Sequence, residues 1–155
     1  MNDAEIKQMC LQLTETSKAA YLTTIDAEGY PHTTAMLNLR NSETWPKLVP
    51  LFSENQEEYK VIFTTNTSSR KVQHIRANPK VSVYYCNPDD WKGFMVNGDI
   101  EIVSDPELKR SLWHDGWENY YPMGFDDPDH TVLRLIPKLG KGWTGSNTFD
   151  FSLGD

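Results

Sequence analysis

The sequence is poor in cysteine and has no long hydrophobic run. Among its 155 residues, Cys10 and Cys86 are the only cysteines, and they are too far apart to form a Cys-x-x-Cys pair. No run approaches the ~20 apolar residues of a transmembrane helix. The N-terminus has no basic segment followed by an apolar stretch, as a secretory signal has. We therefore predict a cytoplasmic protein with reduced cysteines and no membrane span.

Positive charge is also scarce. The chain carries 15 Lys and Arg against 22 Asp and Glu, so its formal net charge is -7. Proteins that bind nucleic acid usually have a basic surface. We therefore predict no nucleic-acid partner and expect the few basic clusters to serve a small ligand.

No metal-binding pattern is visible. The four histidines are scattered and do not follow the spacing of a motif such as His-Glu-x-x-His. Asp126, Asp127 and Asp129 lie close together, but the glycine and the distal glutamate of an EF-hand calcium loop are missing. We predict a solvated turn there and no metal site.

Short segments of alternating or apolar character dominate what the sequence does contain. They predict strands at 20–25, 30–39, 47–52, 59–65, 80–86, 94–103, 131–136 and 141–144, and helices at 3–17, 69–77 and 106 to about 120. With six or seven of these eight segments as strands of one sheet and the helices at its side, we predict a mainly β fold, a small antiparallel, Greek-key-like split barrel. We predict one domain, 1–155, with an N-terminal helix in 1–18, the barrel in 19–144 and a C-terminal tail in 145–155.

Two glycines are expected to shape the barrel. Gly29 ends the turn of the first hairpin, where a positive φ angle is needed. Gly98 lies inside a predicted strand, which is typical of a bulge or a barrel corner.

The segment 64–79 carries the strongest functional signal. A strand ends at Thr64 and Thr65, a hydroxyl-rich turn follows, and a short helix begins near Ser69 with Arg70 and Lys71 in its first turn. Cations are normally unfavourable at a helix N-terminus, because the helix dipole is positive there. Backbone N–H groups, hydroxyls and two cations together form a phosphate site. The alternative, an ordinary helix cap with two solvated cations, stays open on this pattern alone.

Three segments in a fixed order resemble the pyridoxamine 5'-phosphate oxidase-like superfamily of FMN-binding split β-barrels, and within it the general stress protein branch. They are the hairpin 21–36, the strand, turn and helix start 63–71 with Ile75, Asn78-Pro79 and Val81, and the strand 98–103 leading into Asp105-Pro106. The resemblance covers residues 19–143 approximately.

The resemblance implies a split barrel that binds FMN. It assigns the FMN phosphate to Ser69, Arg70 and Lys71, and places Thr64 and Thr65 beside the ribityl chain or the ring. It further implies a homodimer with FMN between the subunits, in which Trp143 covers the flavin. The strand that lines the isoalloxazine would contribute Thr34, Ala35, Met36 and Leu37.

Two departures from the oxidases argue against the vitamin B6 reaction. The segment 34–37 is uncharged, whereas the oxidases place an Arg and a Lys there, and Arg40 is the nearest cation. The oxidases also bind pyridoxal phosphate through an Arg-x-His element, which 148–155 lacks.

Three functional hypotheses therefore remain open. The first is an FMN-dependent oxidoreductase acting on an unknown small substrate, with no catalytic side chain assigned, because the flavin carries the chemistry. The second is an FMN-binding stress protein without turnover. The third keeps the barrel but replaces FMN by a deazaflavin or haem. His32, next to the presumed flavin segment, is interpreted as a structural strand histidine rather than a proton donor.

Overall fold

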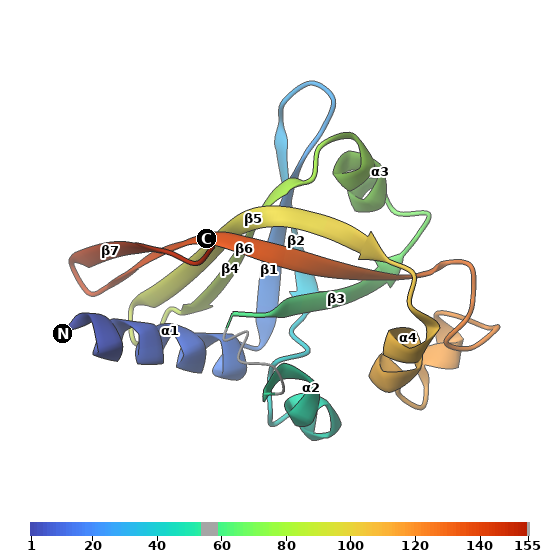
Figure 1. The fold of residues 1–155 in the computed structure, drawn as a ribbon, viewed down its shortest axis with the longest axis horizontal. Helices are drawn as coiled ribbons and strands as arrows, with labels where there is room; N and C mark the ends of the chain where they lie inside the picture. Colours follow the sequence, from blue (N-terminus) through green and yellow to red (C-terminus); the bar gives the residue numbers. More distant parts are fainter. Residues whose placement is uncertain (54–58, 155) are drawn as a thin grey trace.

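The computed structural model describes residues 1–53 and 59–154, and its strands form one antiparallel sheet (Figure 1). The sheet has the strand order β2-β1-β4-β5-β6-β3, with β7 added to β6. The strands are β1 (Ala19–Ile25), β2 (Pro31–Leu37), β3 (Val61–Asn66), β4 (Lys80–Asn87), β5 (Lys92–Val103), β6 (His130–Thr144) and β7 (Asn147–Ser152).

The sheet curls into a barrel that is not closed. β2 and β3 lie at the two ends of the strand order and contact each other without being paired. The predicted mainly β, split-barrel fold is thereby confirmed. The first hairpin also has the expected turn, with Gly29 at a φ angle of 89°.

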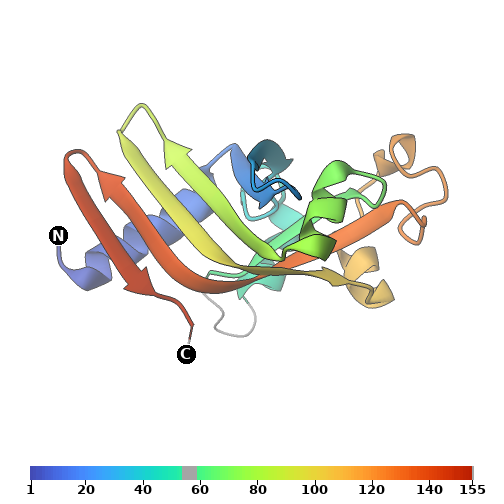
Figure 2. The same ribbon diagram turned by 90° about the horizontal axis from the view of Figure 1, so that it is seen from above.

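Helices α1 (Asp3–Thr16), α2 (Val49–Ser53), α3 (Arg70–Ala77) and α4 (Pro106–Leu112) flank the sheet (Figures 1 and 2). Asn2 and Glu5 form a capping box at the start of α1. Asp105 accepts a hydrogen bond from the Glu107 N–H and begins α4 with Pro106 in its first turn. In the described part of the chain no helix is both long and apolar enough to cross a membrane.

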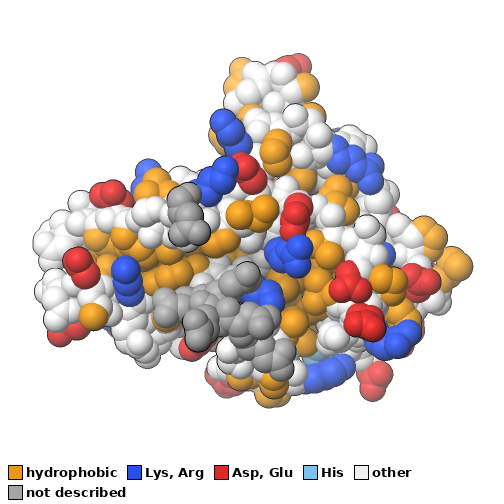
Figure 3. Space-filling model, in the orientation of Figure 1, with side chains coloured by type: hydrophobic (Ala, Val, Ile, Leu, Met, Phe, Trp, Pro, Cys, Tyr) orange, Lys and Arg blue, Asp and Glu red, His pale blue; other side chains and the backbone are white. Residues whose placement is uncertain are grey.

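The main core lies between α1 and the inner face of the sheet. Its largest fully buried side chains include Tyr85, Phe63 and Phe94. Partly buried apolar side chains of α1 and β7 pack on its margin, and Figure 3 shows hydrophobic surface gathered between these two elements. A second, smaller cluster joins α4, the turns after it and β3.

The predicted strand 47–52 is wrong, because a short 3-10 helix at Pro46–Leu48 and α2 occupy these positions. Proline is favoured in the first turn of a helix, and Pro46 stands there. Leu48, Leu51 and Phe52 follow helical spacing and face the second cluster. The sequence 53–58 predicts a polar connection, of which 54–58 lie outside the described residues.

The predicted break in the last strand is also wrong. β6 runs without interruption through Pro137, which lies opposite Gly98 at a shift in the β5–β6 register. This bulge is the irregularity predicted for Gly98, and it tolerates a residue without an N–H donor. The expected tail at 145–155 contains β7, which pairs with β6 from Leu139 to Thr144.

The helix predicted to run to about residue 120 ends early. α4 stops at Leu112, and a separate 3-10 helix covers Trp117–Asn119. Trp113 has an extended backbone and Gly116 a φ angle of 97°, so the helical path is interrupted between them.

Candidate functional site

The predicted phosphate-binding residues lie together where β3 passes into α3. Thr64 and Thr65, predicted to lie beside the ribityl chain or the ring, are near the C-terminal end of β3. Ser69 is the N-cap of α3. The Lys71 ammonium donates a hydrogen bond to the Thr65 hydroxyl over 3.3 Å, which ties the first turn of the helix back to the strand. Arg70 is exposed at the first helical position. We call Ser69, Arg70 and Lys71, the three residues predicted to hold the phosphate, the phosphate grip.

Ser69 does not use its side chain as a helix cap. It has the extended backbone of an N-cap, yet its hydroxyl makes no capping hydrogen bond. The Oγ atom is buried and has no hydrogen-bond partner within the described structure. A buried hydroxyl without a partner is costly. It would regain a partner by donating to a phosphate oxygen at the helix start.

The charges around the grip also favour an anion. Partial burial lowers the pKa of Lys71, because its ammonium loses part of its hydration. The ion pairs formed among residues 1–53 and 59–154 include neither Arg70 nor Lys71. Two cations at a helix N-terminus that are not neutralised by a carboxylate fit a phosphate group.

Residues 34–37 lie on β2, at one edge of the split barrel. Met36 faces the core, while Thr34, Ala35 and Leu37 are exposed, Leu37 to 53%. β2 and β3, the strand that carries Thr64 and Thr65, are the two edge strands of the sheet. They contact each other across the split in the barrel. The structure therefore places the β2 and β3 parts of the predicted site on the two edge strands that face each other across the split.

Trp143 does not join these residues within one chain. β6 begins at His130, which pairs with Asn66 near the grip, and Trp143 lies 13 residues further along the strand. At a rise of ~3.3 Å per residue, this corresponds to about 40 Å along the strand. Figures 1 and 2 show the β6–β7 turn and α3 in opposite parts of the molecule.

Around Trp143 the sheet has an aromatic surface of its own. The Trp143 indole and the Tyr84 hydroxyl both lie against Gly93, and the Trp143 ring lies 5.5 Å from that of Trp91, which is 62% exposed. Gly93 permits this arrangement, since a Cβ there would lie 2.2 Å from the Tyr84 hydroxyl oxygen. A groove of about 650 Å³ lies beside Trp143. Residues that line it include Tyr84, Met95, Lys141, Trp143 and Asp150.

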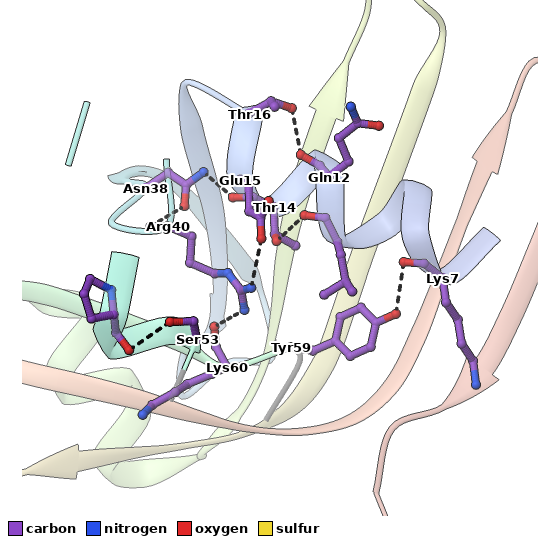
Figure 4. A network of polar contacts seen from close by, with 12 residues as sticks. Lys7, Gln12, Thr14, Glu15, Thr16, Asn38, Arg40, Ser53, Tyr59 and Lys60 are labelled. Atoms are coloured by element: carbon purple, nitrogen blue, oxygen red, sulfur yellow. Dashed lines mark hydrogen bonds and ion pairs between the residues drawn. The ribbon is translucent and has the colours of Figure 1, made fainter. Parts of the chain in front are cut away.

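Arg40 turns inward and away from the exposed face of β2. Its side chain is 6% exposed, donates to the Lys60 carbonyl over 2.9 Å and lies 3.8 Å from the Glu15 carboxylate (Figure 4). Its guanidinium also stacks on Phe52. Arg40 therefore joins α1, α2 and the residue before β3, and it does not supply a cation to the segment 34–37.

The histidines have mainly local roles. His32 is exposed, and its Nε2 is hydrogen-bonded to the Asp26 carboxylate at 2.8 Å. His74 is hydrogen-bonded to the Thr24 hydroxyl through Nδ1 and packs against His32. These contacts dock α3 onto the first hairpin, and they agree with the structural interpretation of His32.

Sequence analysis missed Asp129 as a part of the site. Its carboxylate accepts hydrogen bonds from the Ser68 N–H and the Asn66 side chain, directly before the grip. The Asp126–Asp129 segment is therefore more than a solvated turn. The cluster of acidic residues was visible, but the pairing of Asn66 with the start of β6 that brings Asp129 to the turn was not.

Comparisons with known proteins agree with this architecture. Residues 6–144 match the model of the pyridoxamine 5'-phosphate oxidase family. A protein from Clostridium acetobutylicum related to general stress protein 26 is 31% identical, covering 97% of this chain and 96% of its own, with a TM-score of 0.77. None of the curated protein sequences matches this chain.

Two more distant structures share the fold. General stress protein 26 from Bacillus anthracis has 18% identity, a coverage of 95% of this chain and 99% of its own, and a TM-score of 0.69. An F420 reductase has 24% identity, a coverage of 83% and 93%, and a TM-score of 0.56.

Proposed function

The chain belongs to the pyridoxamine 5'-phosphate oxidase family, and from this premise we propose that it is a cytoplasmic homodimer that binds FMN and transfers electrons between the flavin and a small substrate. The observation that carries the proposal is the phosphate grip. Ser69 offers a buried hydroxyl without a partner beside Arg70 and the partly desolvated ammonium of Lys71. A phosphate monoester supplies the acceptor and the charge that these groups fit.

The homodimer is supported by the exposed face of β2 and by the position of Trp143. Ala35, Tyr21, Tyr84 and Met95 pair in one row across four strands, so they share one face of the sheet. Tyr21 is 37% exposed in this uncharged row, which suits burial against a second copy. Trp143 is remote from the grip of its own chain, so it covers the flavin only as Trp143 of the partner subunit.

In this proposal the protein holds and shields the flavin. FMN, when bound, supplies the hydride and electron chemistry. Ser69, Arg70 and Lys71 hold the phosphate, and the edge strand β2 at Thr34 and Ala35 orients the ring. The apolar side chains around the seam exclude water from it.

A second candidate, an FMN-binding protein without turnover, is favoured by the neutral surroundings of the ring. The Arg40 guanidinium does not point to the segment 34–37, because it contacts the Lys60 carbonyl and the Glu15 carboxylate. The sequence of 148–154 contains no Lys, Arg or His, and its Phe149 and Phe151 pack on the core. This also argues against pyridoxamine 5'-phosphate as the substrate. A deazaflavin or haem in place of FMN is the third candidate.

Photoreduction of the FMN-loaded protein, followed by rapid mixing with oxygen or with a soluble quinone, tests the proposed activity. We expect reoxidation by at least one acceptor at a rate on the order of enzyme turnover, 1 s⁻¹ or faster. Absorbance of the flavin near its visible maximum follows the reaction. Bound FMN that is not reoxidised at such rates would favour the binding protein, and a protein that fails to retain FMN would contradict both candidates.

A further inference from the structure

The segment before and within the start of β6 grips the turn that leads into α3. Asp129 Oδ1 accepts from the Ser68 N–H at 2.8 Å, and Oδ2 accepts from the Asn66 amide at 2.7 Å. The Thr67 N–H donates to the Asp129 carbonyl at 2.8 Å, and the Thr67 hydroxyl donates to the Pro128 carbonyl at 2.9 Å. Three consecutive turn residues are thus fixed to one short segment that is more than 60 positions away in the sequence.

Asp129 is itself held in place by the loop around it. Its N–H donates to Asp127 Oδ1 at 2.9 Å, and Asp127 Oδ2 accepts from the Met123 N–H at the same distance. His130 is buried and bonds the Phe125 carbonyl through Nδ1 at 2.7 Å. Asp127 is 7% exposed. The Asp129 carboxylate is therefore presented by a rigid base rather than by a freely moving loop.

The charge of Asp129 opposes the function of the site that it touches. Hydrogen bonds from Asn66 and Ser68 lower its pKa, so the carboxylate is ionised at neutral pH. It accepts a hydrogen bond from Ser68, the residue before Ser69, and would repel a phosphate dianion bound at Ser69. A carboxylate that only added charge at this position would weaken binding. Its hydrogen bonds to the turn are the compensating contribution.

We propose that Asp129 is a positioning residue for the phosphate grip: its carboxylate holds the Asn66–Ser69 turn in the conformation that presents Ser69, Arg70 and Lys71 to a phosphate. The proposal rests on the proposed binding of FMN for its functional consequence. The hydrogen bonds between Asp129 and the turn are a property of the protein alone, and their effect is measured without any ligand.

The first test is hydrogen exchange at the Ser69 amide, which donates to the Asn66 carbonyl at 3.0 Å and does not touch Asp129. In Asp129→Ala we expect this amide to exchange roughly tenfold faster, since a turn that has lost a charge-assisted hydrogen bond opens more often. Asp126→Ala removes the same charge from an exposed position in the same loop and should leave the exchange rate unchanged. An unchanged Ser69 rate in Asp129→Ala would overturn the proposal.

The second test is FMN affinity, in which positioning and simple charge predict opposite signs. Asp129→Ala should raise the Kd for FMN on the order of tenfold, although a repelling charge has been removed. Asp129→Asn keeps an oxygen for the Ser68 N–H without the charge, and we expect it to bind FMN at least as tightly as the parent. Tighter binding of FMN by Asp129→Ala would show that Asp129 acts on the site only by charge repulsion, and the proposed positioning role would be wrong. If the parent fails to bind FMN while Ser69 exchange responds as expected, the proposed function is wrong, but the role of Asp129 in holding the turn is confirmed.

Discussion

Alanine at both Arg70 and Lys71 is expected to weaken FMN binding by about a hundredfold or more. Each cation contributes a charge-assisted hydrogen bond to the phosphate, worth about 1.5 kcal/mol or more, and two such losses correspond to roughly a hundredfold in Kd. Quenching of flavin fluorescence during titration gives the Kd of parent and variant. Because Lys71 also bonds Thr65, the single variant Lys71→Ala should show the larger share of the loss.

Two controls separate phosphate recognition from general damage. Arg76→Ala removes a cation from the last turn of the same helix, away from the grip, and should leave the Kd for FMN unchanged within about twofold. Riboflavin lacks the phosphate, so the double variant should bind it as the parent does. If the double variant loses riboflavin and FMN in the same proportion, Arg70 and Lys71 do not hold the phosphate.

The second large effect is expected at Gly98, in the bulge of β5. A Cβ at Gly98 would lie 2.1 Å from the backbone oxygen of Ile136, and backbone has no rotamer by which to move aside. Gly98→Ala should therefore lower the free energy of unfolding by about 3 kcal/mol, the upper part of the range for overpacked sites. Urea denaturation of parent and variant measures this difference.

Gly93→Ala in the same strand is the matched control. Its Cβ would meet the Tyr84 hydroxyl and the Trp143 indole, which are side chains that can rotate. We expect a loss of about 1 kcal/mol, together with a changed tryptophan emission. If Gly93→Ala is the more destabilising of the two, backbone crowding at the bulge is not what requires Gly98.

The fold was predictable from sequence wherever the local pattern and the tertiary environment agree. The alternating residues of β4 and the turn at Gly29 behave as their sequence predicts, because one side of the sheet is buried along its length. The stretch 47–52 was misassigned as a strand because its apolar residues at 48–49 and 51–52 are also compatible with a short strand. Pro46 and the spacing of Leu48, Leu51 and Phe52 were the signals for a helix.

The candidate site divides in the same way. Thr65, Ser69 and Lys71 follow one another in sequence, so their proximity was foreseeable from a strand that leads into a helix. Asp129 reaches the turn only through the pairing of β3 with β6, which no local pattern encodes. Whether Trp143 meets a flavin depends on a second subunit, and its distance from the grip becomes evident only with the length of β6.

The most direct test of FMN binding through the phosphate grip is the visible absorption spectrum of the protein after incubation with FMN and removal of the free ligand. We predict a retained flavin spectrum with shifted, structured bands in the parent and its absence in the Arg70→Ala, Lys71→Ala double variant. A colourless parent protein, or a double variant that retains as much FMN as the parent, would contradict the account.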